Sequence, residues 1–106
     1  MKDNVVKDKS LEFAVRIVNL YKFLVNEQKE FVMSKQILRS GTSIGANIRE
    51  AEQAQSRADF INKLNIALKE ANETEYWLEL LIRTEYITRE QYESINNDLS
   101  LIHISE

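Results

Sequence analysis

The residues best suited to chemistry lie in the stretch RSGTSIGA, residues 39–46. This stretch holds both glycines of the 106-residue chain, Gly41 and Gly45, among hydroxyl side chains. Such a stretch can cradle a phosphate through free backbone N–H groups, or it can let two helices approach closely. A phosphate loop follows a strand and usually ends in Gly-Lys-Ser/Thr. Here no strand is indicated and no lysine follows Gly45, so the Gly-x-x-x-Gly spacing predicts a packing seam.

On a helical wheel the two glycines fall in the apolar stripe of their helix, and Ser40, Ser43 and Asn47 fall on the opposite side. Each glycine inside a helix costs about 1 kcal/mol relative to alanine. We therefore expect a neighbouring helix to approach closely there in compensation. The polar edge formed by Ser43, Asn47 and Glu50 is left as a surface for a partner.

No set of catalytic groups can be assembled from the sequence. Thr42 and its neighbouring serines are the candidate nucleophiles, but no base with a supporting acid can be placed beside them. The one histidine, His103, has no histidine or cysteine partner and is expected to be solvated. Glu27, Lys29 and Glu30 fall in a link between helices and are assigned no role. We predict no enzymatic activity, no cofactor and no metal.

One carboxylate, that of Glu75, falls inside the apolar stripe of its helix on the wheel. A buried carboxylate is costly unless it is paired. The favoured interpretation is a polar tie to Arg49 or another group of the preceding helix, which would fix the register of the two helices. Di-iron bundles also place glutamates inward, but they supply Glu-x-x-His pairs from two helices. This chain has no such motif.

A loose concentration of cations suggests a second class of function, RNA or DNA binding. The chain as a whole is acidic, with 14 basic and 17 acidic residues and a net charge of −3. That balance disfavours a dedicated nucleic-acid binder, and acidic residues alternate with the cations. The candidate nucleic-acid contacts are Arg39, Arg49, Arg57, Lys63 and Lys69.

Helices joined by short polar links must position all these residues. The chain has no proline and only two glycines, so it lacks the turn residues that hairpins need. Helix-start signals stand at Ser10, Ser34, Ser56 and Thr88. The last two are followed three residues later by an aspartate and a glutamine, in the manner of a capping box. The apolar spacing predicts helices over roughly 11–28, 34–55, 57–86 and 89–104.

These elements predict a single all-α domain, residues 1–106, folded as an up-down-up-down four-helix bundle. The first helix has two apolar stripes, one containing Leu11 and Val15 and the other Phe13 and Ile17. The third helix also has a second apolar face. A monomer exposing those second faces would carry an unusually large apolar patch, so we predict a homo-oligomer. The candidate interface residues are Phe13, Ile17, Leu24, Trp77, Leu80 and Leu81.

The absence of cysteine fits a reducing compartment, and the polar N-terminus is unlike a secretory signal. The apolar runs are too short to span a membrane. We expect a cytoplasmic protein without a membrane partner.

About half of the chain, residues 39–81, resembles a family of four-helix bundles encoded in bacterial 23S rRNA intervening sequences. A serine-rich turn precedes the Ala-Asn-Ile-x-Glu motif of residues 46–50, and a Ser-x-x-[Asp/Glu]-Phe helix start follows at residues 56–60. Ile66-Ala67 and the paired glutamates Glu73 and Glu75 complete the pattern. The polar positions of these motifs are Ser43, Asn47, Glu50, Glu73 and Glu75.

The resemblance implies a ring-shaped assembly, with a homopentamer as the best-known arrangement, and no established enzyme activity. A related branch, the accessory variability determinant proteins of diversity-generating retroelements, forms a basic pentameric barrel that works with a reverse transcriptase and nucleic acid. This chain departs from that branch in being net acidic. The function expected first is therefore a structural or protein-interaction module, and the alternative is an RNA- or DNA-binding accessory protein.

Overall fold

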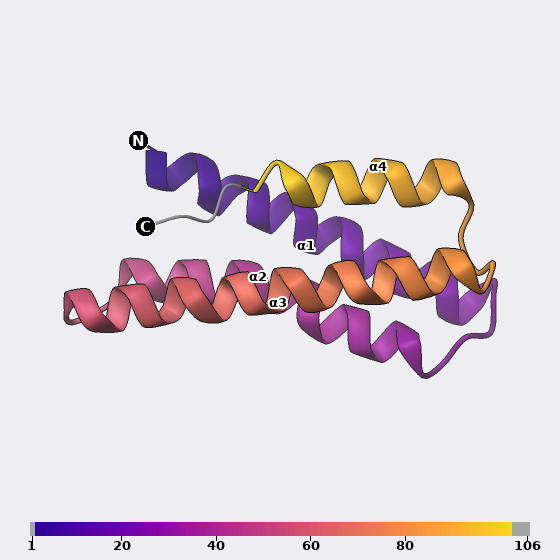
Figure 1. The fold of residues 1–106 in the computed structure, drawn as a ribbon, viewed down its shortest axis with the longest axis horizontal. Helices are drawn as coiled ribbons and strands as arrows, with labels where there is room; N and C mark the ends of the chain where they lie inside the picture. The colour runs from indigo at the N-terminus through magenta and orange to yellow at the C-terminus, as the bar shows by residue number, and fades with distance from the viewer. Residues whose placement is uncertain (1, 103–106) are drawn as a thin grey trace.

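Four helices make up residues 2–102, the part of the chain that the structure, a computed structural model, describes (Figure 1). They are α1 (Lys2–Asn26), α2 (Met33–Glu52), α3 (Arg57–Arg83) and α4 (Arg89–Ser100). No strand occurs in these residues, so the predicted all-α class is confirmed. The molecule is elongated along the helices, with extents of 43 × 22 × 19 Å.

The helices form a bundle in which each one packs against the next. Helix α4 also packs against α1, but no Cα atoms within 8 Å of each other join α1 to α3 or α2 to α4. Helices α1 and α3 therefore lie diagonally across the bundle. The α1–α2 and α3–α4 loops lie at one end of the molecule and the α2–α3 loop at the other (Figure 1). Helix α4 has 12 residues against 27 in α3, so it covers only part of the length of α3.

The core is built from one face of every helix. Large branched side chains dominate it, because they fill the space between four converging helices at interior packing density. Ile17, Leu24, Ile37, Ile44 and Leu78 are fully buried. Apolar burial of this kind is the main term that holds such a bundle together.

Helix α1 begins much earlier than the sequence predicts, at Lys2 rather than near residue 11. Ser10, interpreted as a helix start, lies inside α1 and is buried. Its Oγ donates a hydrogen bond of 2.9 Å to the carbonyl of Lys7. A serine that binds its own helix in this way gives no cap, which is why the signal misleads.

The other helix ends follow the expected signals more closely. Ser56 Oγ accepts from the backbone N–H of Asp59 at 3.1 Å, and Thr88 with Gln91 forms the complete capping box. Helix α3 stops at Arg83 rather than 86, because Glu85 adopts a left-handed φ of 68°. The expected end of the last helix, residue 104, lies outside the described residues, as does His103.

Helix α2 is capped by a residue to which the sequence gives no role. Glu30 is buried, and its carboxylate accepts hydrogen bonds from the backbone N–H groups of Val32, Met33 and Ser34 at 3.2, 3.0 and 2.7 Å. These donors have no partner inside the helix, and a negative charge at a helix N-terminus is favourable. Ser34, the expected cap, is instead buried in the first turn, and its Oγ has no partner.

The two glycines form the predicted packing seam, and the helix that approaches them is α1. A Cβ atom built on Gly41 would lie 2.8 Å from Cγ1 and 2.9 Å from Cγ2 of Ile17. A Cβ atom on Gly45 would lie 3.2 Å from Ser10 Oγ and 3.3 Å from the Ser10 carbonyl oxygen. The missing side chains therefore allow α2 to lie directly against α1.

We predict that Gly41→Ala destabilises the chain, although alanine favours helix formation. The new methyl group meets the buried, β-branched Ile17, so we expect a loss of about 1–3 kcal/mol through overpacking. Urea unfolding monitored by circular dichroism measures it. In an Ile17→Ala background the clashing atoms are gone, and the same change should cost clearly less. Equal costs in the two backgrounds would contradict the seam.

A second prediction concerns the cap of α2. Glu30→Ala removes the acceptor of three backbone N–H groups, so we expect the free energy of unfolding to fall by about 1–2 kcal/mol. The matched control is Glu27→Ala, three residues earlier at an exposed position, which should change stability by less than about 0.5 kcal/mol. Similar thermal midpoints for the two variants would show that Glu30 is no cap.

Candidate functional site

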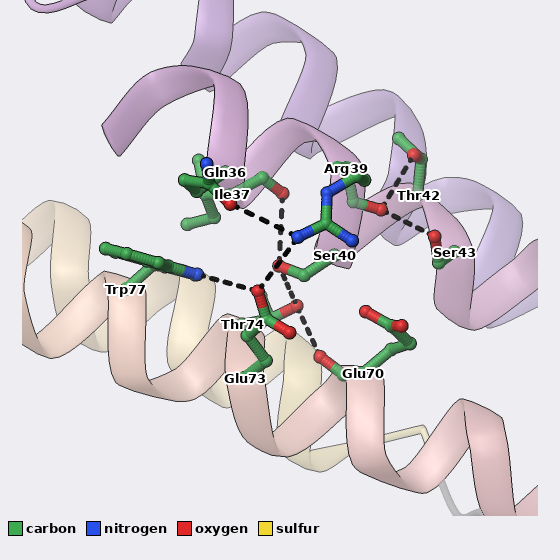
Figure 2. A network of polar contacts seen from close by, with 10 residues as sticks. All are labelled: Gln36, Ile37, Arg39, Ser40, Thr42, Ser43, Glu70, Glu73, Thr74 and Trp77. Carbon is green, nitrogen blue, oxygen red and sulfur yellow. Dashed lines mark hydrogen bonds and ion pairs between the residues drawn. The ribbon is translucent and has the colours of Figure 1, made fainter. Parts of the chain in front are cut away.

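A network of polar contacts, which we call the polar seam, joins α2 to α3 (Figure 2). At its centre the hydroxyls of Ser40 and Thr74 lie 2.9 Å apart, and both residues are fully buried. Thr74 Oγ1 also lies 2.8 Å from the Glu70 carbonyl oxygen of the preceding turn. Sequence reasoning placed Ser40 on the polar side of its helix, which is wrong: that side faces α3.

At the solvent edge of this seam, Glu73 links the two helices. Its carboxylate accepts a 3.1 Å hydrogen bond from Trp77 Nε1 and lies 3.5 Å from Arg39 Nη2 (Figure 2). Arg39 also donates to Gln36 at 3.2 Å. The partly exposed ion pair contributes little energy, but it orients the indole of Trp77.

Of the family-motif positions on α2, two bind the backbone of their own helix and one is exposed. Ser43 Oγ donates to the Arg39 carbonyl at 2.7 Å, and Asn47 Nδ2 donates to the Ser43 carbonyl at 2.9 Å. Both side chains are thus engaged by their own helix. Glu50 lies on the surface, with Oε1 3.5 Å from Lys63 Nζ.

Glu75 is exposed, so the predicted buried tie between Glu75 and Arg49 is wrong. The buried line of α3 runs through Ala67, Thr74 and Leu78, and Thr74 occupies the inward position that the wheel assigned to Glu75. Adjacent residues of a helix lie about 100° apart, so only one of Thr74 and Glu75 can point into the core. The helical wheel counted threonine as a surface residue and therefore left Thr74 outside the core stripe. The methyl group of threonine suits a core position once its hydroxyl has a partner.

The five candidate nucleic-acid contacts are not brought together as one site. Arg39 pairs with Glu73 and Lys63 with Glu50, so two of the five cations face acidic partners. Among the described residues, Arg49, Arg57 and Lys69 form no ion pair, and all three are exposed. The structure therefore shows a mixed-charge surface in this part of the chain.

The candidate interface residues turn out to lie mostly inside a single chain. Phe13, Ile17, Leu24 and Leu81 are at most 2% exposed, so the expectation that a monomer exposes them is wrong. The side chains of these four residues fill the core, and that of Ile17 packs against Gly41. Trp77 and Leu80 are half-buried on α3, with the Tyr76 and Trp77 rings in an edge-to-face contact at 5.1 Å between their centroids.

The stripe of α1 that the sequence assigned to the core is the one that faces outward. Leu11 and Val15 are 51% and 55% exposed, and Ala14 and Val18 beside them are half-buried. We call these four residues the α1 face. A groove of about 260 Å³ adjoins it, lined from α1 by Lys7, Leu11 and Ala14 and from α2 by Gly45, Ala46 and Arg49.

A second surface, of mixed polar and apolar character, lies on α3. Leu68 and Tyr76 are 45% and 57% exposed, and the exposed Asn72, Glu75 and Glu79 lie at helical spacing between and beside them. We call these five residues the α3 face. The sequence signal for the α1 face was its helical period, whereas the residues of the α3 face were not predicted to form a surface of their own. What it could not reveal was which of two stripes the neighbouring helices would cover.

Neither a metal site nor a membrane span emerges from the geometry. No group of three or more His, Cys, Asp or Glu side chains in residues 5–102, the part whose side chains the structure describes, is arranged to hold a metal ion. None of the four helices is both long and apolar enough to cross a bilayer.

The fold and its surfaces define the chain as a small all-α protein of four packed helices, with an apolar face on α1 and a mixed face on α3. The model of the 23S rRNA-intervening sequence protein family matches residues 2–104. The chain belongs to that family, as the motifs of residues 39–81 predict.

A solved structure closely resembles this one. It is the 1.70 Å crystal structure of a protein of unknown function from the S23 ribosomal protein family of Bacteroides thetaiotaomicron VPI-5482. The two chains are 97% identical, the match covers 96% of this chain and 91% of the other, and the TM-score is 0.95. No curated protein matches the chain. The relation to the retroelement accessory proteins stays a prediction.

We predict that the polar seam is cooperative. Thr74→Val keeps the shape of the side chain but leaves Ser40 Oγ buried without its cross-helix partner, so we expect a loss of about 1–3 kcal/mol. Ser40→Ala should have a cost of the same order. The double variant should lose clearly less than the sum of the two, because neither hydroxyl is then left unpaired. Additive losses in chemical unfolding would argue against a shared hydrogen bond.

Proposed function

We propose that this chain is a non-enzymatic structural or protein-interaction module that works as a ring-shaped homo-oligomer of up-down-up-down bundles in the cytoplasm. The observation that carries the proposal is the α1 face. Leu11 and Val15 lie in the middle of a long helix, yet more than half of each side chain is exposed. The expected number of copies is five, as the family resemblance implies.

Burial of the apolar area that a single chain leaves exposed would stabilise the assembly. Burying the remaining exposed part of a leucine or valine side chain stabilises by roughly 1 kcal/mol. Several such side chains close together, beside a groove, provide a surface that soluble monomers seldom leave open to water. A contact that covers the α1 face would remove this exposure.

The polar seam supports a structural role rather than a catalytic one. Ser40 and Thr74, the most buried hydroxyls of the seam, face each other inside the core, where a substrate has no access. Ser43 and Thr42 donate to carbonyls of their own helix at 2.7 Å. A nucleophilic hydroxyl would need an adjacent base and an open approach.

Nucleic-acid binding remains the alternative prediction, and the mixed charges around Arg39 and Lys63 give it less support. A binder of RNA or DNA should retain a structured RNA at low salt and lose affinity steeply as salt rises, because counterions are released on binding. An absence of retention at 50 mM salt would contradict the alternative.

We predict that the mass in solution corresponds to several copies of the 12.4 kDa chain, with five copies expected. Sedimentation velocity and light scattering over a range of micromolar concentrations measure it. The ratio of absorbance at 260 and 280 nm in the same sample reports any co-purified nucleic acid. A mass of one chain at the highest concentration tested would refute the assembly.

A further inference from the structure

We propose that the α1 face and groove of one copy bind the α3 face of the next copy. This inference deepens the proposed function and rests on it, because it names the two surfaces through which the copies would assemble. It commits to a second copy of this chain as the occupant of the groove.

The selection begins with the exposed large hydrophobic side chains, of which eight are found among the described residues. Four lie in the first turn of α1, in the α1–α2 loop or at the end of α4: Val5, Phe31, Val32 and Leu101. The other four lie well inside long helices, two on the α1 face and two on the α3 face. A single exposed apolar side chain is ordinary, whereas Leu11 and Val15 lie one turn apart beside the groove and form a patch of the kind that marks a binding surface.

The position of the two faces decides which kind of contact covers them. Helices α1 and α3 are diagonal in the bundle, so the faces cannot meet within one chain. A two-fold contact of α1 face with α1 face would leave every α3 face in water. A head-to-tail contact of α1 face with α3 face covers both surfaces of every copy, and such contacts close into a ring when the rotation permits.

The charges of the two surfaces are complementary. Arg49 and Lys7 lie at the groove, whereas Glu75 and Glu79 lie on the α3 face. Lys7 and Glu79 already have partners in their own chain, Glu52 at 3.3 Å and Arg83 at 2.9 Å. Within residues 5–102, whose side chains the structure describes, Arg49 and Glu75 form no ion pair, and we assign each to the other across a contact between copies.

The apolar parts of the two surfaces also fit in kind. Tyr76 is more exposed than Leu68 on the α3 face, and it carries a large apolar ring with a polar tip. The groove offers small side chains at Ala14 and Ala46, which leave room for such a ring, with Leu11 as one wall. Aromatic side chains inserted in a pocket are typical anchors of protein interfaces.

The first test exchanges the two charges. Arg49→Glu and Glu75→Arg each place like charges against each other across the contact, so each should weaken assembly about tenfold or more in sedimentation experiments at low salt. The double variant restores an opposite-charge pair and should recover most of the affinity. Two weakened single variants without recovery in the double variant would overturn the assigned pairing.

The second test measures the direction of the contact. Leu11→Glu blocks the α1 face and Tyr76→Lys blocks the α3 face, so each variant alone should be monomeric. A 1:1 mixture retains one intact face on each partner and should form a heterodimer and nothing larger in native mass spectrometry. If the Tyr76→Lys variant alone forms a dimer, the contact is two-fold and the head-to-tail inference is wrong.

Two controls separate the possible failures. Val32→Glu changes an exposed apolar residue outside both faces and should assemble like the unmodified chain. Circular dichroism and thermal unfolding verify that each variant is folded. A monomeric unmodified chain would refute the proposed function itself. An assembled unmodified chain whose mass neither Leu11→Glu nor Tyr76→Lys alters would refute only this choice of surfaces.

Discussion

The rest of the bundle depends on the close approach of α2 to α1, where Gly41 meets Ile17. A side chain at position 41 would occupy the space that the two γ carbons of Ile17 fill. Because that space is free for Ile17, the apolar stripe of α2 turns fully inward and Ile37 and Ile44 reach the core. The same rotation points Ser40 at α3. The absence of a side chain at Gly41, on the side of α2 that faces α1, therefore determines which residue of α2 must face α3.

The hydrogen bond between Ser40 and Thr74 fixes the register of α2 against α3 more strictly than apolar packing does. Apolar side chains tolerate a shift between helices better than hydrogen bonds do, since dispersion has little directionality. Sliding α3 by one turn along α2 would separate the two hydroxyls, and each would lose its partner on the other helix. The buried pair therefore selects one register of α2 against α3, and Glu73 with Arg39 marks the same register at the surface.

The sequence is informative where local chemistry decides the structure. The spacing of Gly41 and Gly45, the cap at Ser56 and the capping box at Thr88 depend on few neighbours, and all are found as predicted. The cap of α2 by Glu30 was missed, because a glutamate two residues before the helix-boundary residue Val32 follows no simple cap pattern.

Other features depend on which helix lies where, and the sequence alone cannot supply this. Both stripes of α1 are apolar and have the same period, so nothing in α1 itself distinguishes the inward Ile17 from the outward Val15. The glycine seam of α2 makes this distinction, because Gly41 packs against Ile17. The interchange of Thr74 and Glu75 has the same origin: the rotation of α3 is set by the hydroxyl of Ser40 on another helix.

The short α4 has a consequence for how the molecule moves. It joins the core through a narrow line, Ile95, Leu99 and Ile102, and Arg16 holds its surface through Asp98 at 2.7 Å. Helices α1, α2 and α3 keep their glycine seam and hydroxyl pair when this line separates. Amide hydrogens of α4 should then exchange with solvent through local detachment, whereas those in the middle of α2 exchange only when the whole chain unfolds. We therefore expect the last helix to detach as a separate cooperative unit from a three-helix body.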